Sequence, residues 1–318
     1  MENLPRIGAG AARDLGSPAL RSSGDLVVDR RFLYAEDCAA AGDHAAAAEL
    51  LEQTLGLAPH WAPLWLALAV AQEKLGRLDQ AGTAFAQAAA LDPVGELGAE
   101  LHLARLGAAA TPMAAPESYV RGLFDQYADR FEAHLVGKLA YRAPALLAAA
   151  LERLGATHFS HVIDLGCGTG LCGAAFRAMS LRLTGVDLSP RMISAARGKA
   201  VYDRLETGEI AGFLLREPAA SVSLVLAADV LVYVGDLAAI CAGAARALEP
   251  GGFFAFTLQR VADGDYEIGS DMRYRHGEAY VRAVTSAAGL KIVVLEAVSM
   301  RKDAGVDAPG LVVVAARG

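Results

Sequence analysis

A glycine-rich turn that directly follows an apolar run is the feature of this sequence that most restricts its fold. Residues 162–170 read Val-Ile-Asp-Leu-Gly-Cys-Gly-Thr-Gly, and a helix is expected to open at Leu171. Glycines permit a tight turn and remove side chains where a ligand lies against the main chain. A strand, such a turn and a helix in this order predict a ligand-binding edge of a parallel α/β sheet.

The sequence after residue 117 alternates strand-like apolar runs with amphipathic helical stretches, which predicts an α/β domain whose parallel sheet is covered by helices on both faces. We expect seven strands, one of them short and weakly apolar near Leu205–Ile210. The other six are His161–Leu165, Leu181–Asp187, Val222–Ala227, Phe253–Leu258, Lys291–Ala297 and Leu311–Ala316.

The first third of the chain is rich in alanine and leucine at helical spacing and repeats itself. One offset, 34 residues, relates two sets: Gly42, Ala47, Gln53, Leu57 and Pro59 recur as Gly76, Ala81, Gln87, Leu91 and Pro93. The period and spacing resemble tetratricopeptide repeats, in which glycine turns between paired helices and a small alanine permits their close approach. The alternative is an ordinary helical bundle with chance periodicity.

These patterns divide the 318 residues into four parts. We predict a disordered leader at 1–27, a small all-α tetratricopeptide-like domain at 28–106, a linker at 107–116 and the α/β domain at 117–318. About three repeats are usually needed for independent stability. We therefore expect the two repeats and one more helix to pack against the next domain or against another subunit. A homodimer is one arrangement that would supply such a contact.

Composition excludes several classes of function. A net charge of −7 gives no general attraction to phosphate backbones, so nucleic acid is a disfavoured partner. The four cysteines are scattered and form neither a disulfide framework nor a metal-ligand cluster, so we expect no metal and a reducing compartment. Apolar runs fall short of the roughly 20 residues that span a bilayer, which predicts a soluble, cytoplasmic protein that does not associate with a membrane.

The glycine turn departs from the nicotinamide-binding fingerprint, because Leu171 stands where a third glycine or alanine is required and Asp164 precedes the first glycine. The segment instead resembles motif I of class I S-adenosylmethionine methyltransferases, which have a Rossmann-like seven-stranded domain. In that family the glycines face the methionine part of the cofactor, and the acid helps to bind its ammonium group. The resemblance therefore implies S-adenosylmethionine as cofactor.

A second acid, Asp187, ends the next predicted strand and is followed by Ser189 and Pro190. A carboxylate at a strand's carboxyl end can accept hydrogen bonds from both ribose hydroxyls, the role of the equivalent acid in Rossmann folds. Ser189 and Pro190 fit the N-cap and first residue of the next helix. Taken alone, Asp187 would equally fit a turn; the paired Asp164 and the glycines favour the cofactor.

The resemblance implies further positions whose match is weaker. The family places an acid against the adenine amino group after the third strand, where Glu209 stands, although a solvated loop glutamate fits nearly as well. Asp229 and Tyr233 stand where the reacting methyl group and the acceptor meet, and either could orient or deprotonate the acceptor; a core role fits Tyr233 equally. His276, in a substrate-loop region, is a third candidate base, although an ordinary surface histidine fits better.

Aromatic residues at helical spacing precede the α/β core, at Tyr119, Phe124, Tyr127 and Phe131, together with Arg130. An aromatic stripe is more often core, but its position before motif I favours a lid over the cofactor. The complete set of residues expected to contact the cofactor is Tyr119, Tyr127, Arg130, Asp164, Gly166, Cys167, Gly168, Thr169, Gly170, Asp187, Leu188, Met192, Glu209, Ile210 and Asp229.

The order of repeats, tyrosine-rich connection and motif I resembles a group of bacterial predicted methyltransferases with N-terminal tetratricopeptide repeats. This resemblance implies methyl transfer from S-adenosylmethionine to a small-molecule or protein-borne acceptor that it does not identify. Two alternatives stay open: a non-catalytic adaptor whose repeats bind a protein and whose α/β domain holds the cofactor as a structural or sensory ligand, and a nicotinamide-dependent oxidoreductase.

Overall fold

The computed structural model describes residues 20, 22–128, 131–132, 141–303 and 306–318. The chain forms two compact units, which are treated separately. The helical unit comprises residues up to Gln126 together with Ser270–Met272, and the sheet unit comprises Tyr127–Gly269 and Arg273–Gly318. The boundary lies at 126/127, ten residues after the predicted start of the α/β domain at 117, because the helix at Glu117–Tyr127 belongs to the helical unit. The predicted leader lies outside the described residues up to residue 19.

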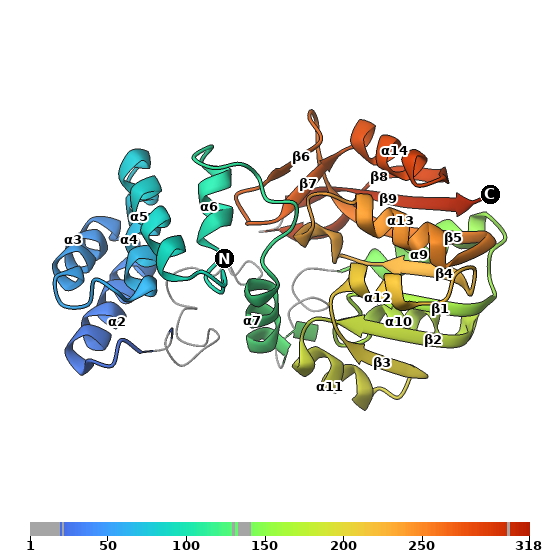
Figure 1. The fold of residues 1–318 in the computed structure, drawn as a ribbon, viewed down its shortest axis with the longest axis horizontal. Coiled ribbons are helices and arrows are strands. Elements are labelled where there is room, and N and C mark those ends of the chain that lie inside the picture. Colours follow the sequence, from blue (N-terminus) through green and yellow to red (C-terminus); the bar gives the residue numbers. More distant parts are fainter. Residues whose placement is uncertain (1–19, 21, 129–130, 133–140, 304–305) are drawn as a thin grey trace. The chain divides into compact units, whose positions relative to one another are not determined.

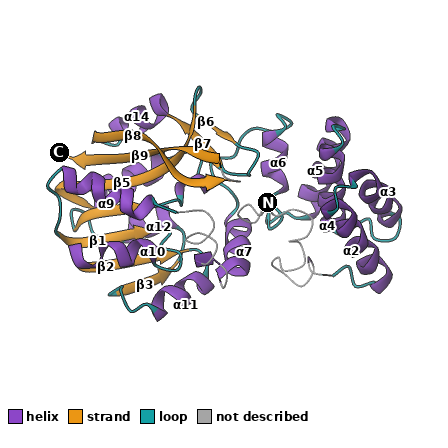
Figure 2. Cartoon of the chain, turned by 180° about the vertical axis from the view of Figure 1, so that it is seen from behind, coloured by secondary structure: helices purple, strands orange, loops and turns teal. Residues whose placement is uncertain are grey.

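The described part of the helical unit contains only helices and connecting turns (Figure 2). They are α2 (Leu26–Ala40), α3 (His44–Leu55), α4 (Ala62–Lys74), α5 (Leu78–Leu91), α6 (Ala99–Arg105) and α7 (Glu117–Tyr127). The 34-residue period corresponds to one pair of helices. Gly42 and Gly76 turn the chain within each pair at φ of 86° and 74°, a left-handed conformation that favours glycine. Ala47 and Ala81 are fully buried, as close helix packing requires.

A charged cluster joins α4 to α6. The His102 ring stacks on Phe85 with 4.4 Å between ring centroids, and the Arg105 guanidinium lies 2.5 Å from the Glu73 carboxylate. His102 and Arg105 beside this carboxylate outweigh its partial burial and lower the pKa of Glu73 to about 2. Glu73 is therefore ionised over the whole neutral range.

The sheet unit contains nine strands in the described residues (Figure 1). They are β1 (Phe159–Leu165), β2 (Ser180–Asp187), β3 (Arg204–Thr207), β4 (Val222–Ala227), β5 (Leu248–Val261), β6 (Tyr266–Ile268), β7 (Tyr274–Gly277), β8 (Leu290–Asp303) and β9 (Val306–Arg317). Seven of them match the predicted strands. The short β6 and β7 were not predicted.

The strands β3-β2-β1-β4-β5 are parallel neighbours in this order, and β9 and β8 continue the sheet beyond β5. Strand β9 runs antiparallel to both β5 and β8, and β7 pairs only with the end of β5 and with β6. The predicted α/β class with a mainly parallel sheet is confirmed. Because β1 to β4 are parallel, their last residues, Leu165, Asp187, Thr207 and Ala227, share one edge, called here the carboxyl edge.

Helices cover both faces of the sheet, as Figure 2 shows. Side chains alternate between faces along a strand, so Val162 of β1 packs with α9 (Ala143–Arg153) and α10 (Leu171–Phe176). Ile163 and Leu165 belong to the opposite core, with α12 (Ile210–Arg216), α13 (Ala238–Ala247) and α14 (Glu278–Ala287). Two apolar layers thus hold the carboxyl edge in place.

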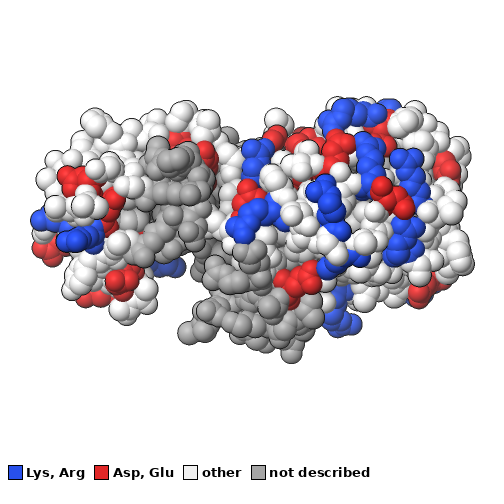
Figure 3. Space-filling view, turned by 90° about the horizontal axis from the view of Figure 1, so that it is seen from below, with Lys and Arg blue, Asp and Glu red and all other residues white. Residues whose placement is uncertain are grey.

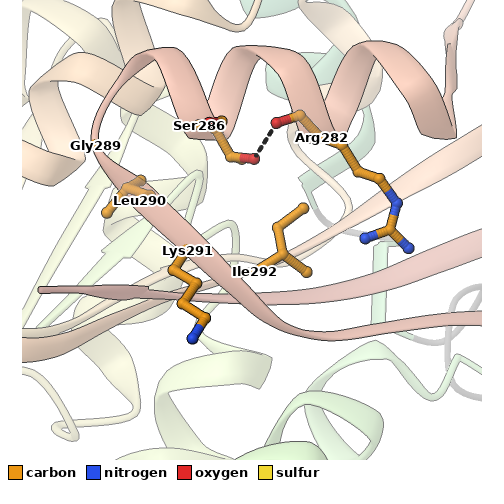
Figure 4. A pocket seen from close by; sticks show the side chains of 7 residues that line it. Arg282, Ser286, Gly289, Leu290, Lys291 and Ile292 are labelled. Carbon is orange, nitrogen blue, oxygen red and sulfur yellow. Dashed lines mark hydrogen bonds between the residues drawn. The ribbon is translucent and has the colours of Figure 1, made fainter.

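Two surface hollows lie away from that edge. One, of about 450 Å³, is lined by residues of the α14–β8 connection, where Ile292 lies between β8 and α14 while Lys291 points away (Figure 4). The other, of about 330 Å³, includes Phe159 and Phe253, near the starts of β1 and β5. Strand β8 runs in the direction of β5, so both hollows lie at the opposite end of the strands from the carboxyl edge.

Candidate active site

The glycine turn connects β1 to α10 at the carboxyl edge, as predicted. Gly166, Gly168 and Gly170 have φ of 62°, 53° and 91°, which all lie in the left-handed region. The Cys167 N–H donates to the Val186 carbonyl at 3.0 Å, and the Gly170 N–H donates to the Cys167 carbonyl at 2.9 Å, so the turn is closed and tied to β2. Any other residue at the three glycines would be strained.

Each of these glycines also faces a different side chain. A Cβ on Gly166 would stand 2.3 Å from Val230 Cγ2, one on Gly168 would stand 3.7 Å from the Phe131 ring, and one on Gly170 would stand 3.1 Å from the Tyr202 ring. Val230 follows the end of β4, and Tyr202 precedes β3. Three segments distant in sequence therefore meet at the turn, and neither Val230 nor Tyr202 was predicted to belong to the site.

Asp187 connects the turn to the second strand. Its Oδ2 accepts a hydrogen bond from the Gly168 N–H at 2.9 Å, and its Oδ1 accepts one from the Ser189 N–H at 2.9 Å. Asp187 is 9% exposed at the carboxyl edge. Ser189 accepts from the Met192 N–H and caps α11 (Pro190–Gly198), with Pro190 in the first turn, so both helix-start predictions are confirmed. The structure thus places motif I and the second acid side by side.

Asp164 lies beneath the turn on β1 and is 1% exposed. Its Oδ2 accepts a hydrogen bond from the Tyr202 hydroxyl at 2.6 Å, whereas its Oδ1 has no hydrogen-bond partner among the described residues. Burial raises the pKa of Asp164 to about 7, and the charge of Asp187 acts in the same direction, while the Tyr202 hydroxyl and, more weakly, the Cys172 thiol and the Gly173 N–H oppose both. One orphaned carboxylate oxygen thus lies below the turn.

The remaining predicted residues of the turn and of α11 are buried around these two acids. Burial raises the pKa of the Cys167 and Cys172 thiols well above the ordinary value, which keeps both thiols protonated and unreactive. Thr169 is 3% exposed, and its Oγ1 has no hydrogen-bond partner among the described residues. Met192 is fully buried in α11, and Leu188 lies half-buried between Asp187 and the cap of that helix.

The loop after β3 also reaches this edge, because the Gly208 N–H donates to the Asp187 carbonyl at 3.0 Å. Glu209, however, is the N-cap of α12: its carboxylate accepts hydrogen bonds of 2.6 Å from the Ala211 and Gly212 N–H groups. The Glu209 side chain thus caps its own helix, and its contact with the adenine amino group stays a prediction. Ile210 is buried in the core beside it.

Asp229 follows β4 with φ of 57°, an uncommon conformation for a residue other than glycine. The Asp229 N–H donates to Thr257 Oγ1 of β5 at 2.9 Å. Tyr233 is 6% exposed, and the Arg273 guanidinium carbon lies 5.7 Å from the centre of its ring. Strained residues of this kind cluster at functional sites. The geometry keeps Asp229 at the carboxyl edge next to Val230, whereas Tyr233 is mostly buried.

His276 is not a surface base. It is fully buried on β7, and its Nε2 lies 2.9 Å and 3.1 Å from the carbonyl oxygens of Val234 and Gly235. Burial lowers the pKa of His276 to about 4, so the ring is neutral near pH 7 and donates from Nε2 to these carbonyls. The prediction of His276 as a catalytic base is therefore wrong: the residue anchors the loop after β4 to β7.

In the structure, the residues of the predicted aromatic lid fall into two groups, of which one lies beside the glycine turn. Tyr127 and Phe131 form an edge-to-face pair with 5.6 Å between ring centroids, and Phe131 faces Gly168. The next residue, Glu132, lies 2.5 Å from Lys199 Nζ, and this cation outweighs partial burial and lowers the pKa of Glu132. Arg130 lies outside the described residues. These contacts attach the segment around Phe131 to the glycine turn and to α11.

Tyr119 does not belong to this segment. It lies in α7 of the helical unit and is 5% exposed, and a Cβ on Gly98 would stand 2.6 Å from its ring. Tyr119 thus packs within the helical unit, and its contact with the cofactor stays a prediction. Phe124 lies in the same helix.

The described residues also bear on other kinds of site. They contain no cluster of histidine, cysteine or acidic side chains that could hold a metal ion, and no helix among them is long and apolar enough to cross a bilayer. On the face shown in Figure 3, lysine and arginine side chains stand among aspartates and glutamates. Ion pairs of the sheet unit include Arg177–Asp203 and Arg204–Glu217.

Two family models match this chain. One, described as a methyltransferase domain, covers residues 162–252, and the other, described as a tetratricopeptide repeat, covers residues 39–106. The first includes the glycine turn, Asp187 and Asp229, and the second includes α3 to α6 and both sets of residues related by the 34-residue offset. Part of the sheet unit is therefore similar to a methyltransferase domain and part of the helical unit to tetratricopeptide repeats, in agreement with the resemblances drawn from the sequence.

Similar curated proteins are named as methyltransferases, and each is similar to this chain over part of its length. The malonyl-[acyl-carrier protein] O-methyltransferase of Serratia marcescens is 30% identical over 145 residues, 43% of this chain and 56% of that protein. The ubiquinone biosynthesis O-methyltransferase of Xanthomonas axonopodis pv. citri (strain 306) is 34% identical over 122 residues, 36% of this chain and 48% of that protein. Human methyltransferase-like protein 27 is 39% identical over 85 residues, 26% of this chain and 34% of that protein. The chain thus spans between a third and just over half of these relatives.

Solved structures share the fold. Magnesium protoporphyrin IX methyltransferase (ChlM) from Synechocystis PCC 6803, with bound SAH, has a TM-score of 0.50 at 18% identity, covering 64% of this chain and 99% of that one. The [4+2]-cyclase SpnF has a TM-score of 0.53 at 19% identity, covering 65% of this chain and 97% of that one. At such identities the likeness establishes the fold alone, and the second structure, described as a cyclase, shows that this fold serves more than one reaction.

Proposed function

We propose that the sheet unit binds S-adenosylmethionine at the carboxyl edge and transfers its methyl group to a small-molecule or protein-borne acceptor. The observation that carries this proposal is the convergence of Asp164, the glycine turn and Asp187 within one hydrogen-bonded arrangement. The methyltransferase-domain match over residues 162–252 supports it.

The residues present fit the cofactor at its two polar ends. The orphaned Oδ1 of Asp164 is a buried acceptor that suits the ammonium group of the methionine part. Each oxygen of Asp187 accepts one backbone hydrogen bond and retains acceptor capacity for a ribose hydroxyl. Gly168 has the most room of the three glycines, since a Cβ there would stand 3.7 Å from the Phe131 ring, so its main chain is the part of the turn that a ligand could approach.

The sulfonium of the bound cofactor supplies an activated methyl group, so this chain needs to provide no covalent nucleophile. Its residues act mainly by alignment and by exclusion of water. Phe131 and Tyr127 place aromatic surface beside the turn, which suits a sulfonium cation. Asp229, just after β4, is the candidate to orient or deprotonate the acceptor, and Tyr233, in the short helical turn that follows, is the less accessible second candidate.

The tetratricopeptide repeats are proposed to bind a protein, either the acceptor itself or a protein that carries it. The adaptor hypothesis is less favoured, because the glycines and both acids of the cofactor site are intact. The oxidoreductase hypothesis is less favoured too, since Leu171 begins α10 where the nicotinamide fingerprint requires a small residue.

Methyl transfer is tested with methyl-tritiated S-adenosylmethionine and a cell extract divided into protein and small-molecule fractions. Label that enters one fraction with the wild-type protein, and not with Asp187→Ala, would support an enzyme and identify the acceptor class. Cofactor binding without transfer to either fraction would contradict the enzymatic proposal and favour the adaptor.

A further inference from the structure

Tyr202 occupies a slot that glycines from three segments leave open. A Cβ on Gly170, Gly173 or Gly185 would stand 3.1, 2.3 or 2.9 Å from an atom of the Tyr202 side chain. Gly173 lies within α10 and Gly185 within β2, where glycine is less favourable than alanine. The close approach of this ring accounts for glycine at both positions.

The slot directs the Tyr202 hydroxyl to one oxygen of Asp164. The hydroxyl donates to Asp164 Oδ2 at 2.6 Å, and Oδ1 is left without a partner among the described residues. Burial raises the pKa of Tyr202 far above the ordinary value, so this hydroxyl stays protonated and acts as a donor. A buried donor fixed by packing is thus aimed at a buried carboxylate.

We propose that Tyr202 is a positioning residue of the cofactor site: it holds Asp164 by Oδ2 so that Oδ1 accepts the ammonium group of S-adenosylmethionine. This inference rests on the proposed function, since it concerns the same site. Tyr202 acts through Asp164 and needs no contact with the methyl group.

The surroundings of Asp164 make binding of the ammonium group depend on pH. The carboxyl faces the charge of Asp187, the protonated thiols of Cys167 and Cys172, and the Tyr202 hydroxyl. With its pKa raised to about 7 by burial, Asp164 is largely protonated in mildly acidic solution, and binding of an ammonium group must expel that proton. Affinity therefore falls as pH drops through the pKa of Asp164, and removal of the hydroxyl moves this fall to higher pH.

The test measures binding of S-adenosylhomocysteine by calorimetry between about pH 5.5 and 8.5, for wild-type protein, Tyr202→Phe and Tyr280→Phe. Tyr280→Phe is the matched control, because its hydroxyl donates to Asp236 at 3.0 Å, away from Asp164. 5′-Methylthioadenosine, which has the nucleoside but lacks the ammonium group, is titrated in parallel. The ligand's own titration cancels in the ratio between variants.

We expect Tyr202→Phe to bind S-adenosylhomocysteine about ten-fold more weakly than wild type near pH 6.5, with the two affinities converging at high pH, which corresponds to a shift of roughly one pKa unit. Methylthioadenosine should bind both proteins alike, and the Tyr280→Phe profile should match wild type. An unchanged profile in Tyr202→Phe would overturn the inference while leaving the proposed function intact. Failure of both ligands to bind wild type would instead contradict the proposed function.

A second measurement covers the case in which Tyr202→Phe does not fold. Protein that contains 3-fluorotyrosine in place of tyrosine keeps every ring and carries a more acidic, stronger donor. Its affinity for S-adenosylhomocysteine should begin to fall at a lower pH than that of the unlabelled protein. A fall at the same or a higher pH would contradict the assigned role of Tyr202.

Discussion

The Gly168 N–H donates a hydrogen bond of 2.9 Å to Asp187 Oδ2, and this bond connects the glycine turn after β1 to the end of β2. It combines a left-handed glycine with a nearly buried carboxylate, so the turn and the proposed ribose acceptor share one geometry.

Replacing Asp187 with alanine should abolish cofactor binding without unfolding the chain. The variant loses the proposed ribose acceptor and one partner of the turn, but the two apolar cores of the sheet are untouched. Isothermal titration with S-adenosylhomocysteine, together with a far-UV dichroism spectrum, measures both effects. Unchanged affinity in a folded variant would remove Asp187 from the site.

Gly166→Ala should destabilise the chain by about 1–3 kcal/mol and weaken cofactor binding, because the residue has φ of 62° and its Cβ would meet Val230 at 2.3 Å. Adding Val230→Ala should restore part of the loss by removing the overlap but not the backbone strain. Gly198→Ala is the control, since a Cβ there meets nothing within 4 Å. Urea unfolding measures the free energies, and equal stability of Gly166→Ala and Gly198→Ala would contradict the packing described.

Asp164→Asn should weaken cofactor binding and yet stabilise the cofactor-free protein at alkaline pH. The folded-state pKa of Asp164, about 7, exceeds its ordinary value of 3.8, so the free protein loses stability as pH rises through this interval. Asparagine carries no charge to bury. The Tm of the variant minus the Tm of wild type should therefore be larger near pH 8 than near pH 4. A Tm difference independent of pH would mean that Asp164 is not a buried, strongly shifted acid.

His276 should remain neutral throughout the range in which most enzymes work. Its pKa of about 4 and its bonds to Val234 and Gly235 predict a ring protonated at Nε2 alone above about pH 5. Nitrogen-detected NMR of labelled protein identifies this tautomer, and exposed His158 provides a reference signal in the same spectrum. Titration of His276 between pH 6 and 7 would restore it as a candidate base.

Glu73→Gln should weaken the helical unit at neutral pH by about 1 kcal/mol, because it removes the charge that pairs with Arg105. The Glu73 pKa falls from 4.5 to about 2 on folding, so its contribution is complete above pH 4.5 and is lost as pH falls towards 2. Both tryptophans, Trp61 and Trp65, lie in this unit, so their fluorescence reports its unfolding. Glu100→Gln, at an exposed acid on α6, is the matched control; equal effects of the two variants would contradict this role of Glu73.

Features with a local or periodic signal were predictable from the sequence. The glycine turn, Asp187 and the cap formed by Ser189 lie within one short stretch of sequence. The common offset of 34 residues indicates the helical repeats. Each of these depends on residues that are near neighbours in the chain. Their structure therefore follows from turn, cap and repeat rules that need no knowledge of tertiary contacts.

Features that depend on contacts between distant segments were missed. Tyr202 meets Asp164 across 38 residues, and the only trace in the sequence is glycine at 173 and 185, where the ring needs space. His276 reads as a loop residue, because β7 is four residues long and is formed through its pairing with β5 and β6.

The most direct test of the account is isothermal titration of the purified protein with S-adenosylmethionine and S-adenosylhomocysteine, with NADH as the control. We predict micromolar binding of the first two, one molecule per chain, and no binding of NADH. Binding of NADH, or binding of none of the three by folded protein, would contradict the assignment of the glycine turn, Asp164 and Asp187 as an S-adenosylmethionine site.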